Sequence, residues 1–287
     1  YNIAIGGGAL GGAKENVAAG GGHLHTVDHN IAIGLDALHG SDLGTSDAIL
    51  LHQGNIAIGS YALDATAANP HLGTIAIGHQ ALSALTSGGQ NLAIGYNAML
   101  TNTTGEHNVV IGYRALINGT GNSSNTVIGY EAMATASASG MISNTAIGWH
   151  AGNAINDANS DGNVLVGYDA GKGGAAAMIG CVAIGHNAMN ATSTNAQTGT
   201  IAIGQSALTA LTTGGGNTAV GYNAGLANQV GKYNTVFGYN AFITSNHIAS
   251  DGSVAIGYDA LRAKDPSSGS IYDDSSTAVG FQAGALE

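Results

Sequence analysis

The sequence predicts an all-β protein that is wound as a solenoid of about sixteen short coils. One short unit recurs throughout the 287 residues, which is the signature of a repeat architecture. The chain contains 47 glycines and only 8% charged residues, unlike an ordinary globular domain. With three Phe and one Trp, its core must consist of Ala, Ile, Val and Leu in thin layers.

Each full copy of the unit has one position that is usually polar, three apolar or Thr positions, a glycine, two variable positions and an alanine. A typical copy is NIAIGLDA at residues 30–37. A degenerate copy, NVAAG ending at Gly20, supplies the sixteenth coil. The fifteen full copies contain the structural repeat glycines Gly6, Gly34, Gly59, Gly78, Gly95, Gly112, Gly129, Gly148, Gly167, Gly185, Gly204, Gly221, Gly238, Gly257 and Gly280.

The five residues that end at each repeat glycine predict a short β-strand followed by a tight bend, because they are rich in β-branched residues and too few for a helix. Neighbouring strand residues point to opposite faces, so both faces of this strand are apolar. We expect the Ile and Val face to fill the interior of the coil. The Ala face then requires cover from another chain, which predicts a homotrimer with three strands close to a shared axis.

An aromatic residue follows the repeat glycine in many copies, and a polar residue and the fixed alanine come next. This alternation predicts a second short strand in the coil. The aromatic residues are Tyr96, Tyr113, Tyr130, Trp149, Tyr168, Tyr222, Tyr239, Tyr258 and Phe281.

The organisation predicted for residues 1–287 is a single repetitive segment of a longer fibre. Irregular coils are expected in residues 1–60, regular coils in 61–250 and a longer loop insertion in 258–275. The formal charge of −11 disfavours nucleic acid as a partner, because phosphates would be repelled. No apolar run reaches the roughly 20 residues that span a bilayer, so no membrane insertion is expected in this segment. The single cysteine, Cys181, is interpreted as a buried thiol.

The pentapeptides NIAIG and SVAIG, the trailing Gly-x-x-Ala and the minimum period of about 14 residues resemble the YadA-like head repeats of trimeric autotransporter adhesins. The stretch NTAVGYNAG at residues 217–225 is similar to repeats of phage tail fibres. The resemblance implies a left-handed parallel β-roll, three copies of which pack into a trimer. Most coils are longer than 14 residues and carry the aromatic residue, which favours a phage or other surface fibre over an adhesin.

Two groups of residues are candidate metal ligands. His23, His25, Asp28 and His29 could hold Zn²⁺ or another transition metal, with a solvated polar loop as the alternative. Asp157, Asn159 and Asp161 match the first half of a calcium loop, although the twelfth position holds Tyr168 instead of Glu. A turn capped by these side chains is the alternative. No other cofactor is expected.

The residues Gly6–Gly11 match the pattern GxGxxG, but glycines 20–22 interrupt any helix after it, so nucleotide binding is not expected. No Ser/His/Asp or Cys/His set is evident, which predicts a protein that is not an enzyme. The favoured function is a structural or attachment fibre on a virion or cell surface, with a glycan or protein receptor. The alternatives are a depolymerase-type tailspike that acts on host polysaccharide, and a monomeric solenoid that binds a regular surface such as ice.

Overall fold

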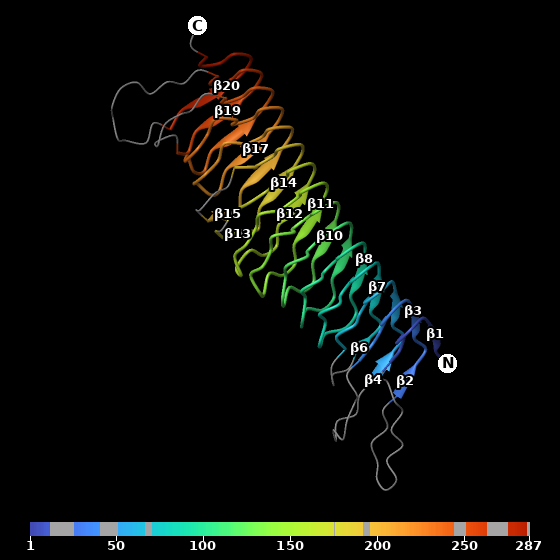
Figure 1. The fold of residues 1–287 in the computed structure, drawn as a ribbon. Helices are drawn as coiled ribbons and strands as arrows, with labels where there is room; N and C mark the ends of the chain where they lie inside the picture. Colours follow the sequence, from blue (N-terminus) through green and yellow to red (C-terminus); the bar gives the residue numbers. More distant parts are fainter. Residues whose placement is uncertain are drawn as a thin grey trace. The chain divides into compact units, whose positions relative to one another are not determined.

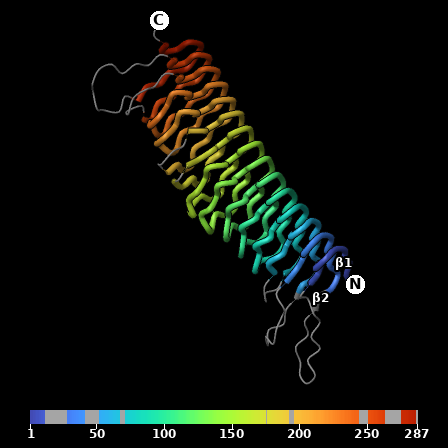
Figure 2. Tube along the Cα trace, in the orientation of Figure 1, coloured from blue at the N-terminus to red at the C-terminus, as the bar shows by residue number. Residues whose placement is uncertain are grey.

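The computed structural model describes residues 1–11, 26–40, 51–66, 71–174, 176–191, 196–243, 251–262 and 275–285. The chain forms two compact units, Tyr1–Ile142 and Ser143–Glu287. Each unit winds through successive coils whose strands lie side by side (Figures 1 and 2). In the described residues all secondary structure is β, so the predicted all-β parallel solenoid is confirmed. The predicted sixteenth copy, which ends at Gly20, lies outside the described residues.

Every full copy of the repeat forms a three-residue strand, and strands that are neighbours within a unit pair in parallel and in register. In the first unit they are β1 (Ile3–Ile5), β3 (Ile31–Ile33), β5 (Ile56–Ile58), β7 (Ile75–Ile77), β8 (Leu92–Ile94), β9 (Val109–Ile111) and β10 (Thr126–Ile128). In the second unit they are β11 (Thr145–Ile147), β12 (Val164–Val166), β14 (Val182–Ile184), β16 (Ile201–Ile203), β17 (Thr218–Val220), β18 (Thr235–Phe237), β19 (Val254–Ile256) and β20 (Thr277–Val279).

Shorter parallel sheets form on a second side of some coils. The first unit has β2 (Thr26–Asp28), β4 (Leu51–Gln53) and β6 (His71–Leu72), and the second has β13 (Met178–Ile179) and β15 (Gln197–Thr198). These strands precede the polar residue of the repeat. The prediction of a second strand after the repeat glycine is therefore wrong for the described coils.

The residues after the repeat glycine form a turn, because two of them have left-handed backbone conformations. In the coil of Gly95, φ is 55° at Asn97 and 52° at Met99. A strand cannot pass through two such residues. The Asn97 amide donates to His79 O of the preceding coil, and the Met99 amide donates to Ala115 O of the following coil. The backbone amides of the turn thus form hydrogen bonds to both the preceding and the following coil.

From β3 onward the interior of the coil contains the residue at the centre of the main strand, which is usually alanine and otherwise Val or Leu. This corrects the predicted orientation. Ala93 is fully buried, whereas Leu92 and Ile94 on either side of it remain partly exposed. The same pattern recurs in the main strands from β3 onward, with a buried centre and more exposed flanks. The thin coil leaves room for the central Ala, the fixed Ala of the turn and one Leu or Met, such as Met99. The larger Ile and Val side chains therefore point outward.

A ladder of buried asparagines closes the corner that precedes most of the main strands. Asn108 donates from its amide nitrogen Nδ2 to Asn91 Oδ1 at 2.9 Å and to Asn122 O at 2.8 Å. Its own Oδ1 accepts from the backbone amide of Asn125 at 3.0 Å. Each amide side chain thereby uses both ends, and the polar position of the repeat is explained by hydrogen bonding inside the corner.

Cys181 interrupts this ladder in the second unit, because a thiol cannot replace both ends of an amide. Its backbone amide still donates to Asn163 Oδ1 at 2.9 Å, but its Sγ reaches only Ile179 O at 3.7 Å. The thiol is buried, as predicted, and burial raises its pKa. It therefore stays neutral at pH 7.

We expect Cys181→Asn to stabilise the second unit by about 1 kcal/mol, because the new side chain can donate to Asn163 Oδ1 and extend the ladder. Urea unfolding followed by circular dichroism measures the change. Cys181→Ser is the matched control and should leave stability nearly unchanged, since Ser253 occupies the same position in a later coil. A Cys181→Asn chain less stable than the serine variant would contradict this explanation.

Candidate interaction surface

The outward residues of the main strands form a mostly apolar surface in each unit. Polar residues interrupt it at some positions: Thr126, Thr145, Thr218, Thr235 and Thr277 in the strands, and Ser60, His79, His186 and Gln205 after the glycine. We call this surface the apolar face and define it by three positions of the repeat: three residues before, one residue before and one residue after the repeat glycine. In the second unit Phe237 is 54% exposed and Val279 is 65% exposed, although both are large and apolar. Such side chains normally lie in a core or an interface.

The aromatic residues after the repeat glycines stack into ladders along the apolar face. In the first unit Tyr113 lies between Tyr96 and Tyr130, with ring centroids 5.4 and 5.2 Å apart and planes within 12°. In the second unit Tyr239 lies between Tyr222 and Tyr258 at 4.9 and 5.5 Å. The rings cover the faces of their neighbours and leave their edges exposed.

The aromatic residues after the repeat glycines alone expose a large apolar area in the second unit. In the second unit the six aromatic residues that directly follow a repeat glycine are each at least 39% exposed: Trp149, Tyr168, Tyr222, Tyr239, Tyr258 and Phe281. Because one such side chain presents about 150–250 Å², together they leave on the order of 500 Å² in contact with water. Contiguous apolar patches on monomeric proteins rarely exceed a few hundred Å², so this surface is suited to contact with another apolar surface.

Charged residues are absent from the apolar face in the sequence of all fifteen full copies. None of its three positions holds Asp, Glu, Lys or Arg, although the chain has 17 acidic and 6 basic residues. Depletion of charge is a property of the buried centre of protein interfaces.

The candidate zinc ligands are described only in part. His23 and His25 lie outside the described residues. Asp28 Oδ1 is 3.5 Å from the amino group of Tyr1, and the His29 ring lies 5.9 Å from the Tyr1 ring. Zinc binding by these four residues remains a prediction.

Among the candidate calcium ligands, Asp157 uses one carboxylate oxygen within its own turn. Asp157 Oδ1 accepts from the Asn159 backbone amide at 2.8 Å and from its Nδ2 at 3.0 Å. The carbonyl oxygen of Asp161 accepts from the Gly180 amide at 2.9 Å. This geometry favours the capped turn, the alternative reading of these residues. Within the described ranges, no three His, Cys, Asp or Glu side chains group as metal ligands would.

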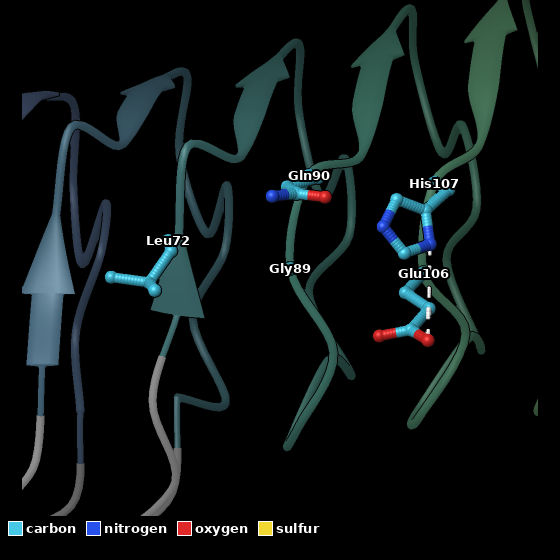
Figure 3. Close-up of a pocket in the computed structure, with 5 residues that line it drawn as sticks. All are labelled: Leu72, Gly89, Gln90, Glu106 and His107. Carbon is cyan, nitrogen blue, oxygen red and sulfur yellow. Dashed lines mark ion pairs between the residues drawn. The ribbon is translucent and has the colours of Figure 1, made fainter.

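A pocket of about 280 Å³ lies on the loop side of the first unit, lined by Leu72, Gly89, Gln90, Glu106 and His107 (Figure 3). His107 Nδ1 is 3.8 Å from Glu106 Oε1, and both side chains are more than half exposed. Water screens so exposed a pair, which leaves it little energy for holding a ligand. The apolar face is therefore the stronger candidate for function.

In the parts of the chain that the structure describes, no helix could cross a bilayer. Comparisons with protein-family models, curated proteins and solved structures found no match for this chain.

Proposed function

We propose that this chain is a non-enzymatic segment of a fibre on a virion or cell surface, in which three identical chains pack side by side and bury their apolar faces. The apolar face carries the proposal, because it has no acidic or basic residue, is rich in aromatic rings and recurs in coil after coil. With its aliphatic residues included, the face of one unit reaches on the order of 1,000 Å², which is the area that each partner buries in a stable complex.

The repeat also supports identical partners. Every coil presents the same three outward positions at one strand spacing, so a second copy in parallel meets each rung with a matching rung. A partner with another period would lose this match within a few coils. The resemblance to adhesin and tail-fibre repeats extends the proposal to about sixteen left-handed coils and to a glycan or protein receptor that is contacted by the outward loops.

The mass of the protein in solution tests this function. Sedimentation equilibrium of the full chain should give three times 28.2 kDa, and the assembly should persist in mild denaturant because its contacts are extensive and apolar. A stable particle of 28.2 kDa would contradict the proposal. It would favour the solitary solenoid that binds a regular surface.

The absence of catalysis is tested separately, with purified chain and polysaccharide from a candidate host. We expect attachment to the surface without the release of new reducing ends. Release of reducing ends would contradict the non-enzymatic part of the proposal and favour a tailspike that cleaves polysaccharide.

A further inference from the structure

Two histidines are stacked inside the first unit, away from the apolar face. His52 in β4 and His71 in β6 are paired in register on neighbouring parallel strands. Their ring centroids are 5.4 Å apart and their planes differ by 21°. His52 is 4% exposed and His71 is 0% exposed, so both imidazoles lie in the interior of the coils.

Each imidazole has one nitrogen without a hydrogen-bond partner. His71 Nδ1 lies 3.2 Å from Gly88 O, and because a carbonyl only accepts, this nitrogen carries the proton. His71 Nε2 is then an unpaired acceptor, and His52 Nδ1 is also unpartnered. A second proton on either ring would create a buried donor with nothing to bond to, which is costly.

No carboxylate among the described residues compensates for a charge on these rings. Asp28 of β2 is paired with Gln53, so it lies on the face opposite to His52. In the described residues His71 is the one ionisable group whose charge would shift the pKa of His52. No ionisable group shifts the pKa of His71 in this way. Two imidazolium ions would therefore repel each other inside an apolar coil.

The pKa of His52 is lowered from its ordinary value of 6.5 to about 4, mainly by burial and to a smaller extent by the neighbouring His71. Burial also lowers the pKa of His71. Both rings are thus neutral at pH 7. In opened coils the histidines bind protons as the pH falls below 6.5, whereas in closed coils they do so only at lower pH. The closed coils therefore lose stability relative to the opened coils between about pH 6.5 and 4.

The fold does not require histidine at this place. In the second unit Met178 of β13 and Gln197 of β15 are paired in register, are buried, and precede a glycine by two residues, as do His52 and His71. The same corner can therefore be filled without a titratable group. The imidazole pair adds a response to pH that the equivalent corner lacks.

We propose that the His52–His71 pair is an acid-sensitive latch, which holds the coils of β4 and β6 closed at neutral pH and releases them in acidic surroundings. Release exposes the interior of these coils, including Leu63, while the coils of β13 and β15 stay closed. The latch goes beyond the proposed fibre function and does not depend on the number of chains in the assembly.

Hydrogen exchange measured by mass spectrometry on the full chain tests the latch. After correction for intrinsic exchange rates, protection of peptides that contain β4 and β6 should fall about 50-fold between pH 7 and pH 4.5. Peptides that contain β13 and β15 should change less than threefold. The variant His52→Met with His71→Gln copies the corner of the second unit and should remove the difference.

An equal fall in the variant and the natural chain would overturn the latch, since other groups would then cause it. If the variant is unprotected already at pH 7, NMR titration of labelled histidines in the natural chain decides. His52 should titrate at about pH 4, and His71 should titrate below the ordinary pKa of 6.5. Titration of both rings at their ordinary pKa would overturn the proposal, whereas a change of mass from trimer to monomer would not bear on it.

Discussion

Gly95→Ala is expected to destabilise the first unit by about 4 kcal/mol or more, because the repeat glycines touch one another along the stack. Gly95 has φ of 139°, a conformation that L residues rarely adopt. A Cβ placed there would clash with Gly112 O of the next coil. The Gly95 amide donates to Ile77 O and the Gly112 amide donates to Ile94 O, both at 2.8 Å. Neither coil can therefore move away from the clash without breaking backbone hydrogen bonds.

Urea unfolding of the purified chain measures this loss. Gly180→Ala is the matched control, since φ is 60° at Gly180 but nothing lies within 4 Å of a Cβ there. Its cost should be about 1 kcal/mol, which is the cost of the left-handed conformation alone. Equal losses in the two variants would show that contact between repeat glycines is not what excludes alanine.

Phe237→Asp is expected to convert the proposed trimer into single chains whose coils remain folded. Phe237 points outward from β18 and is 54% exposed, so in a solitary chain the new carboxylate is solvated and costs little. In the trimer the same carboxylate is buried without a partner, at a cost of about 3–5 kcal/mol for each copy. Sedimentation equilibrium reports the mass, and circular dichroism reports whether the coils persist.

Ala158→Asp is the control for the added charge, because Ala158 is exposed in a loop of the same unit. This variant should remain trimeric. If Phe237→Asp also keeps the mass of three chains, the apolar face is not the contact between them. Loss of the β spectrum together with the mass would instead mean that Phe237 supports the coil itself.

The asparagine ladder and the histidine pair differ in how far sequence predicts them. The recurring polar residue before each strand is visible in the repeat, and only its hydrogen-bond partners were missing. His52 and His71 lie in segments of variable length between repeats, so their shared place appears only when the coils are stacked. The one feature of the sequence that marks this place is a glycine two residues after each histidine. Met178 and Gln197 are also followed by a glycine at this distance.

The repeat by itself determined the strands, their parallel register and the uniformity of the coils, because a five-residue pattern with an obligatory glycine permits one local conformation. It also showed that both strand faces are apolar. Which face is inside was decided by the tertiary structure alone. Alternation separates two faces but carries no information on the thickness of the coil. In so thin a coil the interior takes the central residue of the strand, which is usually alanine and otherwise Val or Leu. The flanking isoleucines and valines, and the aromatic rings after the repeat glycines, were thereby left on the outside.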